Sequence, residues 1–222
     1  MKKVIATISL TLLSVVMFAQ TDYLQFSRDI RSYSDRYTDD QVIGLYQNHY
    51  DVPRNTLVQL FSEFDYNWGN VVLGLEISNF LGVPVGELLG VYRDYPQGNG
   101  WGVIAKRYGI KPGSAEFHRM KAMMSNKNRY WRDIYDDYGR YHNPVIARRN
   151  RVQMNDRLLF LEPYSDKEMK KINKEIEKRD KEIAKREQKM MKKWEKDNKK
   201  IYKQNEKIRK EQDKRAKKMS KR

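Results

Sequence analysis

The apolar positions of residues 52–114 follow a pattern that occurs twice, 31 positions apart. Each copy opens on a Val-Pro pair, Val52-Pro53 and Val83-Pro84, and apolar residues follow four, seven and eight positions after the proline. These positions share one face of an α-helix, and proline suits a helix start because its φ is fixed and it lacks an N–H. The pattern therefore predicts two short amphipathic helices, with these residues inward: Leu57, Leu60, Phe61, Leu88, Val91 and Tyr92.

A Trp-Gly pair follows each proline-led segment, and each pair predicts the start of a further helix that ends at a glycine, Gly82 or Gly109. Glycine is favoured there because it adopts the left-handed conformation that closes helices. A third proline then opens another helix. Short near-repeats of this kind bury their apolar faces against one another, which predicts an all-α fold, a compact bundle of short helices. The positions that mark the repeat are Pro53, Trp68, Gly69, Pro84, Trp101, Gly102, Gly109 and Pro112.

The rest of the body is less regular. Residues 21–37 have a loose helical spacing of apolar residues, and Thr38 is the expected N-cap of the helix that follows. An aromatic face, Tyr130, Trp131, Tyr135 and Tyr138, lies on one side of a predicted helix over residues 128–141. These rings have the chemistry to stack on a sugar or a peptide, although aromatic residues at helical spacing more often form core. Residues 145–162 fit either a helix or a strand that closes the core.

Residues 165–222 contain no proline or glycine and are rich in Lys, Glu, Arg and Gln, which favour helices. Ser165 and Glu168 have the spacing of a capping box, so a long charged C-terminal helix is expected to begin there. Its apolar residues recur every seven positions, with one interval of four, between residues 176 and 208. One apolar residue per heptad is half of a coiled-coil seam, so a lone helix and a coiled coil both stay open.

The first residues have the layout of a signal peptide. A basic cap, Met1-Lys2-Lys3, precedes an apolar run over residues 4–19, which is shorter than the roughly 18 to 20 residues that span a bilayer. Cleavage after Ala19 would leave Gln20 first. We therefore expect three parts: a signal peptide over residues 1–19, a helical body over residues 20–164 and a basic tail over residues 165–222. The expected location is the periplasm or the extracellular space, as a soluble protein.

Positive charge is concentrated in the tail. The whole chain has a net charge of +16. Residues 165–222 hold 25 basic and 12 acidic residues, whereas residues 20–164 hold 18 and 17. An anionic partner is therefore expected to bind the tail, through residues such as Lys192, Lys193, Lys199 and Lys200. The candidate partners are an anionic envelope surface, either lipopolysaccharide or lipid, and a partner helix, and the oligomeric state is open.

No residue set in the body indicates catalysis, a metal or a cofactor. The chain has no cysteine, and its three histidines lack metal-ligand spacing. Glu63 and Asp94 occupy equivalent repeat positions, which favours a structural role over acid–base work. Residues 104–121 have the spacing of a helix-turn-helix with Lys111, His118 and Arg119 on its second helix. Export and the near-neutral body disfavour binding to nucleic acid.

The segment Trp101-Gly102-Val103-Ile104-Ala105-Lys106, followed by Gly109-Ile110-Lys111-Pro112, resembles a pattern found in uncharacterised exported helical proteins of Bacteroidota-type bacteria. The ending Phe18-Ala19-Gln20 resembles signal peptides of the same bacteria. The resemblance implies no activity. The sequence favours a non-enzymatic envelope or interaction protein whose tail docks on an anionic surface or a partner helix. The alternatives are a ligand-binding module that uses its aromatic helices and, if residues 1–19 are not a signal peptide, a helix-turn-helix nucleic-acid binder.

Overall fold

The computed structural model describes residues 23–94, 100–111, 113–142, 145–149 and 151–219. The predicted signal peptide and Pro112 lie outside these residues. The chain divides into two compact units, residues 1–177 and 178–222. This division lies within the last helix, α9 (Asp166–Met219), so its first three turns belong to the first unit.

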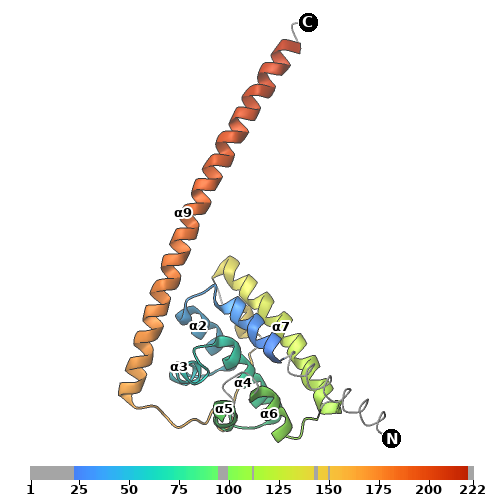
Figure 1. Ribbon diagram of the computed structural model, residues 1–222, viewed down its shortest axis with the longest axis vertical. Helices are drawn as coiled ribbons and strands as arrows, with labels where there is room; N and C mark the ends of the chain where they lie inside the picture. The colour runs from blue at the N-terminus through green and yellow to red at the C-terminus, as the bar shows by residue number, and fades with distance from the viewer. Residues whose placement is uncertain (1–22, 95–99, 112, 143–144, 150, 220–222) are drawn as a thin grey trace, which may run out of the picture. The chain divides into compact units, whose positions relative to one another are not determined.

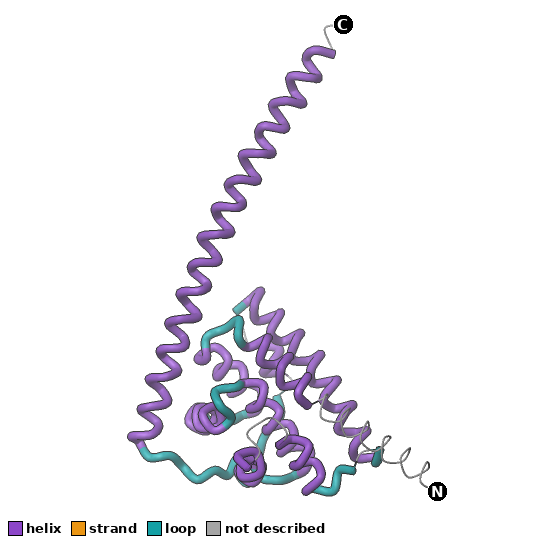
Figure 2. The backbone as a smooth tube through the Cα atoms, viewed as in Figure 1, coloured by secondary structure: helices purple, strands orange, loops and turns teal. Residues whose placement is uncertain are grey.

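The first unit is a bundle of helices (Figures 1 and 2). The described residues form helices, turns and loops but no strand, which confirms the all-α prediction. A helix over residues 23–34 comes first. It is followed by α2 (Asp39–Tyr50), α3 (Arg54–Glu63), α4 (Trp68–Leu81), α5 (Val85–Asp94), α6 (Gly100–Arg107), α7 (Ala115–Tyr141) and α8 (Val145–Arg149). Across the described residues, no helix combines the length and apolar character that crossing a membrane requires.

Local signals set most of the helix ends. Thr38 caps α2 in a capping box with Gln41, and Ser165 pairs with Glu168 at the start of α9 in the same way. Gly82 closes α4 with a φ of 67°, the left-handed region that glycine tolerates best. Pro53 is the residue just before α3 rather than its first helical residue. The proline therefore still defines the start of the helix.

The two tryptophans of the repeat lie in the core and stack on phenylalanines of the α3 region. The Trp68 ring lies 4.0 Å from Phe61, centroid to centroid, and nearly parallel to it. Trp101 stacks on Phe64 at 5.6 Å. The glycine beside Trp68 is needed for close packing, because a Cβ on Gly69 would lie 1.9 Å from the backbone oxygen of Ser27. The Trp-Gly pair thus buries a large ring and lets the helix of residues 23–34 approach α4.

Helix α7 is longer than the sequence pattern indicated. The residues after 114 and the aromatic stretch 128–141 form a single helix of 27 residues, capped by the Ser114 side chain. It runs beside the helix of residues 23–34, the unlabelled blue helix of Figure 1, and Asn128 bonds both Asp29 and Tyr33 of that helix. Its buried side chains are Phe117, Met120, Met124, Trp131, Ile134 and Tyr135.

Residues 145–162, which the sequence left open between helix and strand, form one short helix, α8, and a loop. After α8 the described chain is a loop with one turn at residues 156–159. The backbone of this loop forms hydrogen bonds with the ends of two helices. Val152 N–H donates to the His49 carbonyl near the end of α2, and Val85 N–H at the start of α5 donates to the Leu158 carbonyl. Met154 and Leu158 are buried. The loop therefore closes the core through side chains and through backbone hydrogen bonds at helix termini.

The second unit consists of the helical residues 178–219 of α9. The side chains of residues 185–205 are all exposed. Residues 178–222 hold 21 Lys and Arg against 8 Asp and Glu, a net charge of +13. This helix is therefore stabilised by its own backbone bonds and by ion pairs along its surface, such as Lys210–Glu206 at 2.7 Å.

Candidate functional site

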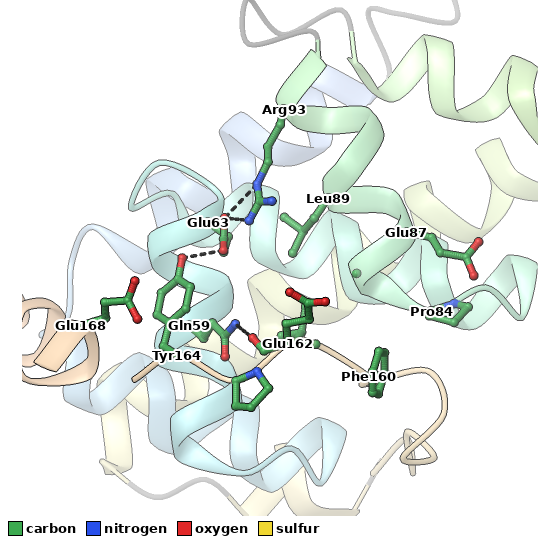
Figure 3. Close-up of a pocket in the computed structure, with 13 residues that line it drawn as sticks. Gln59, Glu63, Pro84, Glu87, Leu89, Arg93, Phe160, Glu162, Tyr164 and Glu168 are labelled. Carbon is green, nitrogen blue, oxygen red and sulfur yellow. Dashed lines mark hydrogen bonds and ion pairs between the residues drawn. The ribbon is translucent and has the colours of Figure 1, made fainter. Parts of the chain in front are cut away.

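A groove of about 610 Å³ lies between α3, α5 and the segment that leads into α9 (Figure 3). Helix α3 contributes Gln59 and Glu63, and α5 contributes Arg93. The remaining lining residues are Pro84, Gly86, Glu87, Leu89, Phe160, Leu161, Glu162, Pro163, Tyr164 and Glu168. The groove thus brings both proline-led helices of the repeat together with the segment of residues 160–168, far along the chain from either.

Glu63 is the most connected polar side chain of the groove. Its Oε1 accepts a 2.5 Å hydrogen bond from the Tyr164 hydroxyl, and its Oε2 accepts a 3.1 Å bond from Arg93 Nε (Figure 3). A second guanidinium nitrogen of Arg93 also pairs with Oε2. The Glu63 side chain is only 10% exposed, while that of Arg93 is 60% exposed. Both carboxylate oxygens are therefore occupied, which suits a structural clamp better than an acid–base group.

The backbone of the crossing segment is held on both sides of this clamp. Gln59 Nε2 donates a 2.6 Å hydrogen bond to the Glu162 carbonyl oxygen. A Cβ on Gly86 would lie 2.8 Å from the Phe160 carbonyl oxygen, so the segment runs close against the start of α5. The Phe160 side chain itself is exposed. These contacts hold residues 158–164 by main-chain atoms, in addition to the side-chain contacts of Leu158 and Tyr164.

The groove is acidic, and Glu63, Glu87 and Glu168 have partners within the protein. Of its described lining residues, Arg93 is the only basic one, against Glu63, Glu87, Glu162 and Glu168. Glu87 accepts from the Tyr108 hydroxyl at 3.3 Å, and Glu168 accepts from Ser165. Burial and the bond to Glu63 raise the pKa of Tyr164 to about 12, so its hydroxyl stays protonated and donates at neutral pH.

A second polar cluster lies inside the body around the buried carboxylate of Glu76. Glu76 Oε1 accepts a 2.7 Å hydrogen bond from Tyr50 and lies 3.0 Å from Lys127 Nζ. The neighbouring His49 holds its Nδ1 2.9 Å from the Tyr130 hydroxyl. A cavity of about 550 Å³ adjoins this cluster, lined by His49, Met123, Asn126, Lys127 and Tyr130.

His49 is neutral in this setting. Its side chain is almost fully buried, and burial together with the nearby Lys127 lowers the pKa of His49 to about 3. The neutral imidazole of His49 and the paired carboxylate of Glu76 are therefore polar groups within the core. Among the described residues, no group of three or more His, Asp or Glu side chains is placed to hold a metal ion.

The predicted aromatic face is divided between core and surface. Trp131 and Tyr135 are buried, and the Tyr135 hydroxyl shares a 2.6 Å hydrogen bond with Tyr46. Tyr130 and Tyr138 are partly buried. Tyr37 stacks on Tyr135 at 5.6 Å between centroids. The two buried rings are therefore in contact with other aromatic side chains of the body.

The other candidates from the sequence lie on different elements. Lys192, Lys193, Lys199 and Lys200 are exposed on α9, in the second unit. Asp94 is exposed, and its neighbour Arg93 is the residue that reaches Glu63. His118 and Arg119 are exposed at the start of α7, which follows α6 in helix-turn-helix order with Gly109 at a φ of 78°.

Sequence reasoning did not find Glu76, Lys127, Arg93 or Tyr164. For Glu76 a signal was present, because it is the one charged residue within the apolar helix α4, and an acid in such a helix is usually paired when buried. For the others no local signal exists, since their partners are 30 to 101 positions away.

The chain was compared with known families, curated proteins and solved structures. No protein-family model, no curated protein and no solved structure matches this chain.

Proposed function

We propose that this is an exported, non-enzymatic protein of the cell envelope that binds an anionic surface through α9. The observation that supports the proposal is the exposure of residues 185–205, combined with a net charge of +13 for residues 178–222. The shared chemistry of the expected partners is a dense array of phosphate groups, as in anionic phospholipids and lipopolysaccharide.

The lysines of α9 are arranged for such a contact. With roughly 100° of rotation per residue, one side of the helix, an arc of about 40°, holds five lysines. They are Lys185, Lys192, Lys199, Lys203 and Lys210. Lys193 and Lys200 lie about 60° to 80° away from this arc. A lysine near an anionic membrane surface contributes about 1 kcal/mol, so a row of them gives useful affinity without apolar insertion.

The first unit supports a non-enzymatic function. Glu63, the most buried carboxylate of its groove, is saturated by Arg93 and Tyr164, and the carboxylate of Glu76 is paired with Lys127. Both carboxylates are thus engaged by partners within the protein, which disfavours an acid–base role for them. The body is therefore interpreted as the carrier of the basic helix.

The test uses the full mature chain and vesicles that contain an anionic phospholipid, with lipopolysaccharide aggregates as a second arm. Replacing Lys192, Lys193, Lys199 and Lys200 by Gln should weaken binding about 100- to 1,000-fold. The same four positions changed to Arg should keep binding, and raised salt should weaken it. Binding to one arm alone identifies the source of the phosphate.

A matched control removes the same charge from the body. The exposed residues Lys111, Arg129, Arg132 and Arg140 are changed to Gln, which should leave binding within about twofold. Equal losses in both variants would mean that net charge alone drives binding, and unchanged binding in the α9 variant would overturn the proposal.

Export is tested separately. The N-terminal sequence of protein recovered from the envelope fraction should begin at Gln20. Protein that remains cytoplasmic with Met1 at its start would contradict the envelope assignment.

A further inference from the structure

The side of α9 opposite the lysine row carries a narrow apolar strip. Four large side chains there are more than half exposed: Met190, Trp194, Ile201 and Ile208. With Ile183 they fall within an arc of about 40°, and their successive spacings are seven, four, seven and seven residues. These spacings fit one uninterrupted heptad frame, since an interval of four leads from position d to position a. Ile183 and Met190 are then d residues, and Trp194, Ile201 and Ile208 are a residues.

The apolar residues of the strip are placed symmetrically about residue 192. Met190 and Trp194 lie two residues on either side of this centre, and Ile183 and Ile201 lie nine residues on either side. In an antiparallel pair of helices, each a position faces a d position of the other helix. A second copy running in the opposite direction therefore places an apolar side chain opposite every one of these four.

We propose that residues 178–205 of α9 pair with the same residues of a second copy in antiparallel orientation. The layers are Ile183 against Ile201 of the second copy and Met190 against Trp194 of the second copy, each formed twice. Met191, which is also exposed, lies beside the strip at the centre and faces Met191 of the second copy across the twofold axis. The occupant that covers the strip is thus the protein itself.

The acidic residues of the same frame favour the antiparallel orientation. Asp180, Glu187 and Asp197 occupy a or d positions. In a parallel pair each of these acids faces the same residue of the second copy, and like charges at such positions are destabilising. In the antiparallel pair Asp180 faces Gln204 of the second copy, so only the contacts between Glu187 and Asp197 oppose two acids.

Those remaining acidic layers have basic neighbours. Each is flanked by Arg186 of one helix and Lys200 of the other, which gives two acids and two bases at the same level. Lys200 already lies 3.6 Å from Asp197 within its own helix. The basic side chains on the flank that carries Arg186 and Lys200 face those of the other helix and repel them. We therefore expect the two helices to associate weakly.

Side-chain size points to the same orientation. A parallel pair would oppose Trp194 to Trp194, whereas the antiparallel pair opposes Trp194 to the flexible Met190, which adapts to irregular gaps. The strip lies opposite Lys192 and Lys199, so pairing does not use the lysine row. The proposal therefore goes beyond the surface-binding function, and disulfide trapping tests it separately from vesicle binding.

Disulfide trapping tests the pairing, because the chain has no cysteine of its own. Full mature chains carrying Ile183→Cys or Ile201→Cys, one of them with a mass tag, are oxidised alone and as a mixture. Antiparallel pairing predicts a crosslinked product in the mixture that contains one chain of each kind, and at least tenfold less product from either variant alone. A matched control pair, Lys185→Cys and Lys199→Cys, has the same symmetry about residue 192 on the opposite side of the helix and should not crosslink.

The trapping experiment is paired with a mass measurement by light scattering across a concentration series. The unmodified chain should move from monomer to dimer mass, and Ile201→Glu should stay monomeric with unchanged helix content by circular dichroism. Crosslinks of Ile183→Cys with itself and of Ile201→Cys with itself would mean a parallel pair and overturn the proposal. A monomer at every concentration, without crosslinks, would also overturn it.

Discussion

The Tyr164 hydroxyl donates a 2.5 Å hydrogen bond to Glu63 Oε1, which joins two residues 101 positions apart in the chain. Arg93 approaches the other oxygen of the same carboxylate. One carboxylate therefore holds α3, α5 and the segment before α9 together. Because Tyr164 contributes a hydroxyl on an otherwise apolar ring, its role can be tested with a change of a single atom.

Replacing Tyr164 by Phe should lower the free energy of unfolding by about 1.5 kcal/mol, because a hydrogen bond to a charged group is lost while the ring still packs. Urea unfolding measures this loss. Hydrogen exchange at the Val85 amide, which is bonded to Leu158, should become faster because the neighbouring segment is held less firmly. Tyr141→Phe is the matched control, since Tyr141 is 69% exposed, and it should change stability by less than about 0.5 kcal/mol. Equal effects of the two substitutions would contradict the clamp.

Replacing Lys127 by Met should lower the free energy of unfolding by about 3 kcal/mol. The substitution leaves the Glu76 carboxylate, which is 2% exposed, without its cation. The double variant Glu76→Gln with Lys127→Met should be more stable than Lys127→Met alone, because it removes the uncompensated charge. A double-mutant cycle in urea gives the coupling energy, and additive losses would argue that the two side chains do not interact.

The stability of the body should fall in mild acid because of His49. Its pKa is about 3 in the folded protein and about 6.5 in the unfolded chain, so only the unfolded chain takes up the proton between these values. The contribution of neutral, buried His49 to the free energy of unfolding is complete above pH 6.5. It is lost progressively as the pH falls toward 3, by about 1.4 kcal/mol per pH unit at most. From pH 6.5 to 5 we therefore expect His49 to account for a loss of up to about 2 kcal/mol.

This loss is measured as a difference between variants. His49→Gln should show a shallower fall in unfolding free energy between pH 6.5 and 5 than the unmodified chain. His118→Gln, at an exposed position, should follow the unmodified chain. Parallel curves for all three proteins would rule out a neutral, buried His49.

Two helical glycines should respond in opposite ways to alanine. A methyl group on Gly69 would meet the Ser27 backbone oxygen at 1.9 Å, so Gly69→Ala must separate two helices and should cost about 3 kcal/mol. Gly44 in α2 has no neighbouring atom within 4 Å of the added methyl. Gly44→Ala should therefore stabilise the protein by about 0.5 to 1 kcal/mol, the usual difference in helix propensity. Thermal unfolding of both variants measures the contrast, and a neutral Gly69→Ala would contradict the close approach.

The parts of the fold that the sequence predicts are those set by neighbouring residues. Thr38, Gly82 and Ser165 cap or close helices at the expected places, because their hydrogen bonds are made within four or five residues. The apolar positions that follow Pro53 and Pro84 are buried for the same reason, since a helical face is a local property.

The parts that the sequence could not predict depend on distant partners. Residues 158–164 contain a dense apolar run, yet Phe160 is exposed, because the segment is held by main-chain bonds to α5 and by Gln59. Hydrophobic pattern carries no information about such bonds. Both polar clusters join helices that meet only in the folded body, so their members had no shared signal in the chain.

The ion pair between Lys127 and Glu76 has a consequence for how α7 is positioned. The apolar contacts of this helix, through Met120, Met124 and Trp131, are non-directional. Sliding α7 by one turn along its axis would bring Met123 or Trp131 to the place of Lys127 and leave the Glu76 charge unpaired, at a cost of several kcal/mol. The buried charge of Glu76 therefore favours one axial register of α7, in the same sense as the hydrogen bonds of Asn128 and Tyr135 to neighbouring helices.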